Sequence, residues 1–346
     1  MKTLKTLGLL ALLLLVLVFP VLLSPNTAVT AVAVFTLIFA AAVTGWNIFS
    51  GYTGYISLGH SVYYGIGTYT IALACQQWNI PGGYIPFLLL PLAGLVAGAF
   101  AIPLGFIALR VRRYTFIVVT IALLFIFQLL AYNLRGITNG SSGVFLPITP
   151  WSSDFFDLPF YYVALALLLL AIGVSWKVRH SKYGLGLLAI RDDEDRALGL
   201  GVKTGPYKLA AYVISAIFVA MAGALFAYYV GIIYPQFGFD PNVDVSITMM
   251  AFLGGLGTLA GPLVGALLVG PLQQWLDLQF GGNGVNLMIY GALFLAVILA
   301  LPRGIVPSAQ QQWRRWQTVR KVRSQSEARA TKPESPGALA ERAGKG

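Results

Sequence analysis

Charged residues are scarce in this chain. Asp, Glu, Lys and Arg make up 10% of its 346 residues, and 58% of the residues are hydrophobic. A soluble globular domain carries roughly 25% charged residues, so this composition excludes one. Together with a mean hydropathy of +0.77, it predicts an all-α, polytopic membrane protein. The net charge of +11 is typical of Lys and Arg in cytoplasmic loops, and we expect no nucleic-acid partner.

Cysteine and histidine are nearly absent. Cys75, the single cysteine, lies in an apolar run and cannot form an internal disulfide, so we interpret it as a small core residue. The two histidines, His60 and His180, have no partner set for catalysis or metal binding. Residues 140–143 match the G-x-S-G pattern of intramembrane serine proteases, but the only later histidine, His180, falls on the opposite side of the predicted topology. We therefore expect no enzyme and no metal site.

Acidic residues are missing from the middle of the hydrophobic segments. A transporter driven by protons or sodium usually carries them there, whereas all twelve acids of this chain are expected in loops, in the tail or near segment ends. A phosphate-binding G-x-x-x-x-G-K-[ST] loop is also absent. We therefore expect this chain to bind no cofactor, and ATP and Mg to lie on a separate ATPase chain. An acidic outer rim is expected from Asp154, Asp157, Asp240, Asp244 and Asp277.

Ten hydrophobic segments of about 20 residues are long enough to cross a membrane. The eighth and ninth contain several glycines and a proline, so they are either two spans or one broken, re-entrant element. The ten segments lie near residues 7–23, 28–49, 55–77, 84–109, 114–132, 159–176, 208–230, 243–257, 259–278 and 285–301.

Basic residues predict the orientation of this bundle. With both termini in the cytoplasm, every Lys and Arg except Arg135 falls on the cytoplasmic side. Residues 1–303 then form the transmembrane domain, with a cytoplasmic loop at 177–207. Residues 304–346 form a basic cytoplasmic tail that is partly disordered. Within the tail, residues 311–323 are either an interfacial helix on anionic membrane lipids or a disordered segment.

The longest charged interval between the first and last hydrophobic runs spans residues 181–201. Four of its apolar residues share one stripe of a helix, which predicts a short amphipathic helix outside the bilayer. Asp192 stands four residues before Arg196, in the order that favours an ion pair. The interval is either a solvated loop or a helix that docks on a soluble partner. The stripe consists of Leu187, Ile190, Ala197 and Leu198.

Glycines are frequent around the third segment, between residues 51 and 67, and again near residues 254–261. Close packing of helices is one explanation. The other is that backbone groups freed by the glycines line a solute path, as in transporters with broken helices. The candidate path residues are Gly51, Gly54, Ser57, Gly59, His60, Gly254, Gly255 and Gly257.

Three stretches carry a recognisable pattern. Residues 51–70 read GYTGYISLGHSVYYGIGTYT, residues 181–227 include SKYGLGLLAIRDDEDRALGLG, and residues 252–268 read FLGGLGTLAGPLVGALL. A fourth, looser stretch is ITNGSSG at residues 137–143. These stretches resemble the permease subunits of branched-chain amino-acid ABC importers, of the LivM type. The resemblance covers most of the chain between the second and ninth segments.

The resemblance implies a type I-like importer in the bacterial inner membrane. This chain and a second, LivH-like permease would enclose the path, with two ABC ATPase subunits below and a periplasmic solute-binding protein above. Residues 183–199 would be the coupling helix, whose apolar stripe contacts the ATPase and whose charges set its register. Closure would swing this helix and the flanking spans, 159–176 and 208–230. The residues on matching positions are Tyr183, Gly184, Ala189, Arg191, Asp192, Glu194 and Gly199.

Two alternatives to this function stay open at the sequence level. Permeases for urea and short amides share the loop pattern, but they usually lack the G-G-L-G-T-L-x-G-P form that occurs here at residues 254–262. That form favours Leu, Ile or Val as the solute. The second alternative is a facilitator that needs no ATPase. Departures from the family pattern at Lys182 and residues 185–187, and the long basic tail after Arg303, leave the identity of the partner ATPase open.

Overall fold

The fold is a bundle of long helices. The computed structural model describes residues 18–20, 27–152, 155–281, 285–300 and 304–312. Most of the first expected segment, most of the tail, Asp154 and Arg303 lie outside these residues. Nine long helices cover the other nine expected segments in the described part of the chain. They are α2 (Thr27–Trp46), α3 (Ser61–Gln77), α4 (Leu90–Ala108), α5 (Arg113–Asn133), α7 (Asp157–Arg179), α10 (Thr204–Val230), α12 (Pro241–Gly254), α13 (Gly261–Phe280) and α14 (Val285–Ala300).

Five helical stretches in the described residues are long and apolar enough to cross a membrane. Two of them include a short helix of another type, the π-helix η1 (Asn47–Gly51) after α2 and the 3₁₀ helix η2 (Ile85–Leu89) before α4. This content agrees with an all-α membrane protein. The five stretches are Ala28–Gly51, Ile85–Ala108, Arg113–Asn133, Asp157–Arg179 and Thr204–Val230.

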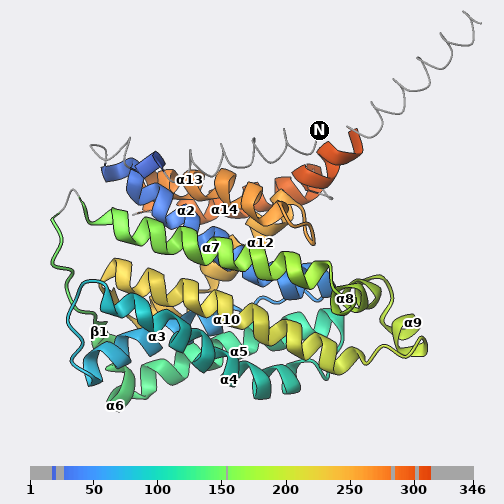
Figure 1. Cartoon of the computed structure of the whole chain (residues 1–346), viewed down its shortest axis with the longest axis horizontal. Coiled ribbons are helices and arrows are strands. Elements are labelled where there is room, and N and C mark those ends of the chain that lie inside the picture. The colour runs from blue at the N-terminus through green and yellow to red at the C-terminus, as the bar shows by residue number, and fades with distance from the viewer. Residues whose placement is uncertain (1–17, 21–26, 153–154, 282–284, 301–303, 313–346) are drawn as a thin grey trace, which may run out of the picture.

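Helices α2 and α10 are central to the bundle. Helix α10 packs against α2, α3, α4 and α7, and α2 packs also against α12 and α13. Figure 1 shows α7 and α10 running side by side along the molecule, with α3, α4 and α5 on one side and α12, α13 and α14 on the other. Helices α10 and α2 are each 61% buried over their most apolar window, whereas α5 is 22% buried. The apolar side chains of α5 therefore face outward from this chain.

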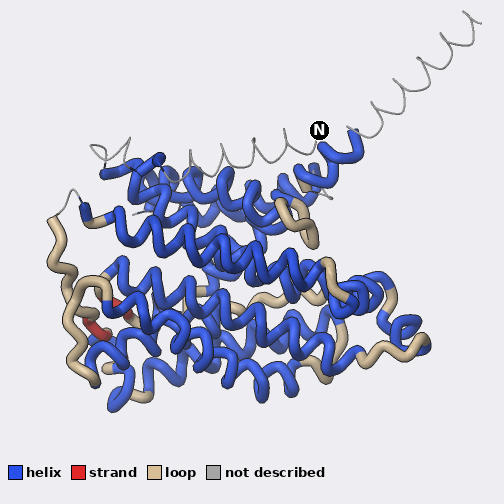
Figure 2. Tube along the Cα trace, in the orientation of Figure 1, coloured by secondary structure: helices blue, strands red, loops and turns tan. Residues whose placement is uncertain are grey.

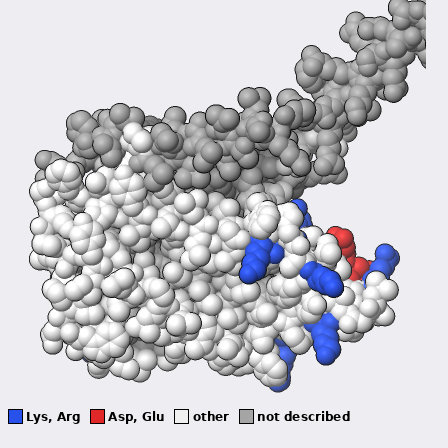
Figure 3. Space-filling view, in the orientation of Figure 1, with Lys and Arg blue, Asp and Glu red and all other residues white. Residues whose placement is uncertain are grey.

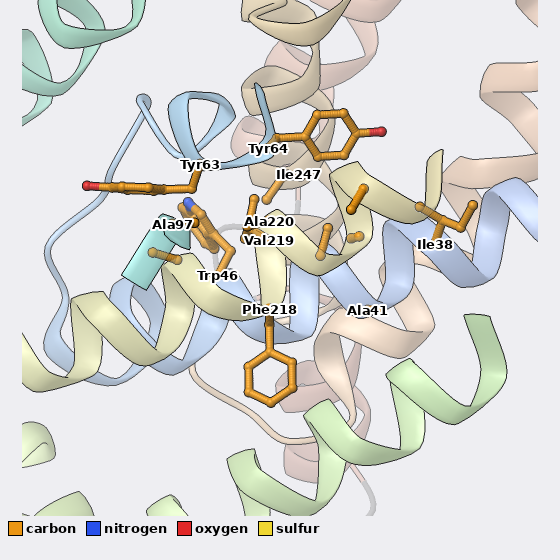
Figure 4. Packing of buried hydrophobic residues seen from close by; sticks show 14 of the residues in the cluster. Ile38, Ala41, Trp46, Tyr63, Tyr64, Ala97, Phe218, Val219, Ala220 and Ile247 are labelled. Carbon is orange, nitrogen blue, oxygen red and sulfur yellow. The ribbon is translucent and has the colours of Figure 1, made fainter. Parts of the chain in front are cut away.

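Small residues let α3 and α10 approach closely. A Cβ atom at Gly67 would overlap the Ala220 carbonyl, and one at Gly223 would overlap the Tyr64 carbonyl. Large side chains fill the space on either side of this contact, and Figure 4 shows Trp46, Tyr64 and Phe218 among them. Glycine at 67 is therefore explained by packing, as the first explanation of the glycine cluster predicts.

The helix of the third segment begins later than predicted, and the helix of the eighth segment ends earlier. Residues 55–60 of the third segment are not helical, and α3 begins only at Ser61. A glycine in the left-handed region, Gly54 (φ +73°), ends the preceding helical stretch, and Gly59 fits against the Thr120 carbonyl, which a side chain would overlap. Likewise α12 stops at Gly254 because Gly255 has φ +123°. The eighth and ninth segments are two helices joined by residues 255–260.

Short elements lie at the two ends of the bundle. Helices α8 (Lys182–Asp192) and α9 (Glu194–Gly199) lie at one end, and Figure 3 shows the charged side chains of the visible face gathered there. We call this the charged end. Figure 2 shows the described strands at the opposite end, where β1 (Val144–Phe145) pairs antiparallel with β2 (Ile232–Ile233). Further short helices are α6 (Arg135–Thr138), η3 (Gly140–Ser142) and α11 (Pro235–Gly238).

Asp244 is not part of an outer acidic rim, so that expectation is wrong for this residue. It lies in the first turn of α12, and its side chain is 2% exposed. Its carboxylate accepts hydrogen bonds from the backbone N–H (3.1 Å) and the hydroxyl (2.5 Å) of Ser61, at the first turn of α3. The neighbouring His60 contacts Ser215 near the middle of α10. Helices α3 and α12 thus begin inside the protein, and Asp244 caps α3 there.

Candidate functional site

Helix α8 is held firmly at its start. The Ser181 hydroxyl caps the helix by accepting a hydrogen bond from the Gly184 N–H (3.1 Å). The Tyr183 hydroxyl donates to the Tyr207 carbonyl (2.7 Å), which ties α8 to the first turns of α10. A side chain at Gly184 would overlap the Val178 carbonyl. Tyr183 and Gly184, both expected coupling residues, therefore fix α8 to the rest of the chain.

The expected single coupling helix is two helices. Asp193 has extended backbone angles between α8 and α9, and its carboxylate accepts hydrogen bonds from the N–H groups of Asp195 and Arg196 (both 3.1 Å). The expected Asp192–Arg196 ion pair is wrong, because Arg196 pairs with Asp193 (3.0 Å). The break has a physical cause: a side-chain cap on α9 replaces the backbone bonds that a continuous helix would make. The cap also holds the pKa of the Asp193 carboxyl below its ordinary value.

Three of the four residues of the predicted apolar stripe face the protein, and the fourth, Leu198, is exposed. Leu187, Ile190 and Ala197 are each 2% exposed or less. They pack on the chain itself, so the expectation that the whole stripe contacts the ATPase is wrong. Together with Leu198, two leucines outside the stripe are exposed at this end, where few apolar side chains are expected on a charged surface. The three exposed leucines are Leu185 (64%), Leu198 (55%) and Leu200 (84%).

A buried ion pair joins α9 to α10. The Lys208 ammonium lies 2.5 Å from the Glu194 carboxylate, and the two side chains are 4% and 12% exposed. The Tyr55 hydroxyl also donates to Glu194, and its ring lies 4.4 Å from the Lys208 nitrogen. Burial opposes ionisation of Glu194, but the hydrogen bonds from Lys208 and Tyr55 outweigh it and hold the pKa of this carboxyl below its ordinary value. Glu194 is therefore an ionised anchor of α9.

Two arginines join α7 and α8 to places in the core where other helices are interrupted. Arg191 of α8 donates to the Gly51 carbonyl at the end of η1 (2.9 Å). Arg179, the last residue of α7, donates to the Gly257 carbonyl in the turn after α12. The side chain of Asn47, the first residue of η1, connects η1 to the turn after α12. It accepts a hydrogen bond from the Gly257 N–H (2.8 Å) and donates one to the Thr258 carbonyl (3.0 Å). The coupling residue Arg191 thus meets the candidate path residues Gly51 and Gly257.

The other candidate path residues lie close to this point or deeper in the bundle. A Cβ atom at Gly54 would lie 3.0 Å from the Arg191 side chain. The imidazole of His60 lies 2.8 Å from the hydroxyls of both Ser57 and Ser215, and His60 is fully buried. These bonds give His60 a structural role. Gly51, Gly254, Gly255 and Gly257 are also buried within this chain, and their place on a solute path stays a prediction.

The remaining expected coupling residues lie on the outer side of the charged end. Asp192 and Gly199 are exposed, and Ala189 is half-buried. Asp195, which was not among them, forms an exposed ion pair with Arg112 (2.9 Å) in the loop between α4 and α5. The exposed residues are therefore free to meet a partner.

Sequence reasoning missed four residues of this site. Tyr55 and Lys208 complete the buried ion pair, and Asn47 and Arg179 complete the contacts of the two arginines. One of them carries a usable signal: Lys208 is a cation at the start of a very apolar segment, where a charge needs a partner. The others are hydrogen-bond donors or acceptors whose partners are distant in sequence, so the sequence alone offers no comparable signal.

Comparison with known proteins gives consistent matches. A family model described as "Branched-chain amino acid transport system / permease component" matches residues 28–298. The chain is 29% identical over 334 residues to the permease protein LivM of the Escherichia coli K12 high-affinity branched-chain amino acid transport system, covering 89% of this chain and 76% of the relative. It is 26% identical over 288 residues to LivH of the same organism, covering 78% and 91%. No solved structure matches.

Proposed function

Because the chain belongs to the family of branched-chain amino-acid transport system permease components, we propose that it forms half of the path by which an ABC importer carries Leu, Ile or Val into a bacterial cell. It is a transporter subunit and not an enzyme. In this proposal the second half of the path is a LivH-like permease, two ABC ATPases bind and hydrolyse ATP with Mg, and a periplasmic protein delivers the solute. The similarity to both LivM and LivH supports a paired permease.

The observation that carries the proposal is the surface formed by α8 and α9. Its inner side is fixed to the bundle through the Tyr183–Tyr207 hydrogen bond and the Glu194–Lys208 ion pair. Its outer side presents three exposed leucines, and charged side chains gather at this end of the molecule (Figure 3). A soluble partner can bury the leucines and pair with the charges, and the fixed inner side passes the partner's movement to α7 and α10. We place the ATPase on this surface, with the charged end in the cytoplasm.

In the proposed transport cycle this chain carries out no covalent step, and ATP is hydrolysed on the separate ATPase chains. Docking of the loaded binding protein and closure of the ATPases shift the equilibrium of the permease pair between its inward-open and outward-open conformations. The solute is released unaltered. We further propose ten spans with both termini in the cytoplasm of an inner-membrane protein. The basic tail then lies beside anionic lipid headgroups, which attract clustered Lys and Arg.

The docking surface is tested by replacing two of its leucines. We expect Leu198→Ser combined with Leu200→Ser to weaken ATPase association about tenfold or more, because burial of a leucine contributes about 2 kcal/mol. The measurement is co-purification of the complex from membranes, followed by solute-stimulated ATP hydrolysis in liposomes. The matched control is Leu95→Ser, at an equally exposed leucine (67%) on α4 away from the charged end.

The three outcomes against the proposal are distinct. Unchanged ATPase association in the double variant places the docking surface elsewhere. Uptake of radiolabelled leucine by vesicles that contain this chain alone would instead indicate a facilitator without an ATPase. Uptake of urea but not leucine by the full complex would replace the proposed solute while leaving the ABC architecture intact.

A further inference from the structure

Two helix C-termini converge on Arg179 and Arg191. The first is the end of α2 and η1 at Gly51, and the second is the turn that follows α12 at Gly257. Carbonyl groups at a helix C-terminus lack intrahelical donors and carry partial negative charge, so a cation there is favourable. Within the part of the chain that the structure describes, neither guanidinium belongs to an ion pair. Both are used to hold backbone carbonyls.

The contact depends on glycine at three positions. A Cβ at Gly257 (φ +75°) would overlap the Arg191 guanidinium and the Gly51 carbonyl. A Cβ at Gly51 would overlap the Asn47 side chain, and one at Gly54 would lie 3.0 Å from Arg191. The Asn47 amide then bonds both the N–H of Gly257 and the carbonyl of Thr258. The backbones of η1 and the 255–258 turn are therefore in direct contact, with the arginines inserted beside them.

We propose that Arg179, Arg191 and Asn47 form a link that carries movement of α8 to the ends of α2–η1 and α12. This inference rests on the proposed ATPase docking at α8 and goes further, because the resemblance implies movement only of the coupling helix and the spans that flank it. Since α3 follows η1 and α13 follows the 255–258 turn, the link connects ATPase closure to four more helices. Arg179 and Arg191 act here as positioning residues.

The link is tested by the ratio of transport to hydrolysis. The full complex with its partner permease, ATPases and binding protein is reconstituted in liposomes, and leucine uptake and ATP hydrolysis are measured on the same vesicles. In Arg191→Met and in Arg179→Met we expect leucine transported per ATP to fall at least about fivefold while hydrolysis changes less than about twofold. Arg191→Lys keeps a donor for the Gly51 carbonyl and restores most of the ratio.

Arg110→Met is the matched control, because this arginine is exposed in the loop after α4, lies outside α8 and α9, and belongs to none of the ion pairs in the described residues. Its transport-to-hydrolysis ratio stays at the wild-type value. An equal loss of hydrolysis and uptake in assembled Arg191→Met complexes would overturn the link and make Arg191 a docking residue. An unchanged ratio in both arginine variants would overturn it as well.

A distance measurement separates failure of the link from failure of the proposed solute. Spin labels are placed at Lys182→Cys on α8 and Ala260→Cys in the turn after α12, both exposed positions, in a Cys75→Ser background. If the wild-type complex hydrolyses ATP without taking up leucine, the solute is wrong, but the label distance still reports the link. We expect ATP to change the distance distribution between the α8 label and the turn label less in wild type, where both labels move together, than in Arg191→Met. Equal ATP-induced changes in the two proteins contradict the link.

Discussion

Lys208 is a nearly buried cation whose position depends on a single carboxylate. The structure pairs it with Glu194, and Tyr55 covers both groups. Removing one member of such a pair leaves the other charge buried without compensation, which typically destabilises a protein by several kcal/mol. Removing both charges together leaves no such penalty. The pair therefore fixes where α9 lies on the bundle.

We expect Lys208→Met to lower the free energy of unfolding by about 3 kcal/mol. The double variant Lys208→Met with Glu194→Gln recovers most of this loss, because no buried charge is left unpaired. Denaturant titration of the purified chain in detergent measures both. Arg112→Met, which breaks the exposed pair with Asp195, serves as control and leaves the unfolding midpoint unchanged. A double variant as unstable as the single one would contradict the pairing.

At the scale of residues, the sequence points to individual residues of the charged interval, but it does not predict the contacts that they make. It identifies Arg191 and Glu194 in the charged interval, but their partners Gly51, Tyr55 and Lys208 all lie outside that interval. It also assigns Asp192 and Arg196 to one ion pair. That pair fails because Asp193 competes for Arg196 once it caps α9.

At the scale of elements, glycines decide how closely helices approach. Gly67 of α3 lies against the Ala220 carbonyl of α10, whereas Gly173 of α7 has no atom within 4 Å of the position of a Cβ. The two positions are both helical, but the same substitution meets backbone at one and open space at the other. They therefore form a matched pair.

We expect Gly67→Ala to destabilise the bundle by about 2 kcal/mol, because the carbonyl of the facing helix must move. Gly173→Ala is expected to stabilise it by up to about 1 kcal/mol, through the higher helix propensity of alanine. Thermal unfolding of the two variants in the same detergent gives the comparison. Shifts of the same sign in both variants would contradict the close contact between α3 and α10.

Helices are predicted well at this scale, and their interruptions are not. Hydrophobic runs predict the positions of the nine long helices in the described residues, since apolar length is the dominant signal for a span. The delayed start of α3 at Ser61 requires the fit of Gly59 against the Thr120 carbonyl. The break between α8 and α9 depends on the Asp193 carboxylate, which caps α9 in the structure. From the sequence alone, that carboxylate could equally well be hydrogen-bonded to water. Such tertiary contacts leave no periodicity in the sequence.

At the scale of the whole molecule, the charged end predicts the orientation in the membrane. The described Lys and Arg on the face shown in Figure 3 lie at this end, and basic loops are retained in the cytoplasm. We expect a membrane-impermeant thiol reagent to label Ile148→Cys in intact cells and Asp192→Cys only after permeabilisation. Ile148 is 92% exposed, and the native Cys75 is buried, so it contributes little background. Labelling of residue 192 in intact cells would contradict the predicted orientation and place the charged end outside the cell.

The membrane class and the family follow from the sequence, because they depend on composition and on patterns within single segments. The place of Asp244 does not. The sequence puts this residue near the end of a segment, which is correct, but α12 begins inside the bundle, where Asp244 caps α3. Only the packing of α3 and α12 against their neighbours shows that the first turn of α12 is buried inside the protein.

The short strand pair has a mechanical consequence at the end far from α8. Strand β1 belongs to the segment after α5 and β2 directly follows α10, and their pairing is extended by a hydrogen bond from the Leu146 N–H to the Gly231 carbonyl (2.9 Å). A force applied to either segment is therefore shared with the other through backbone bonds. A protein that binds the loop after α5 would therefore exert force on the C-terminal end of α10. The N-terminal end of the same helix carries Lys208, which pairs with Glu194 of α9.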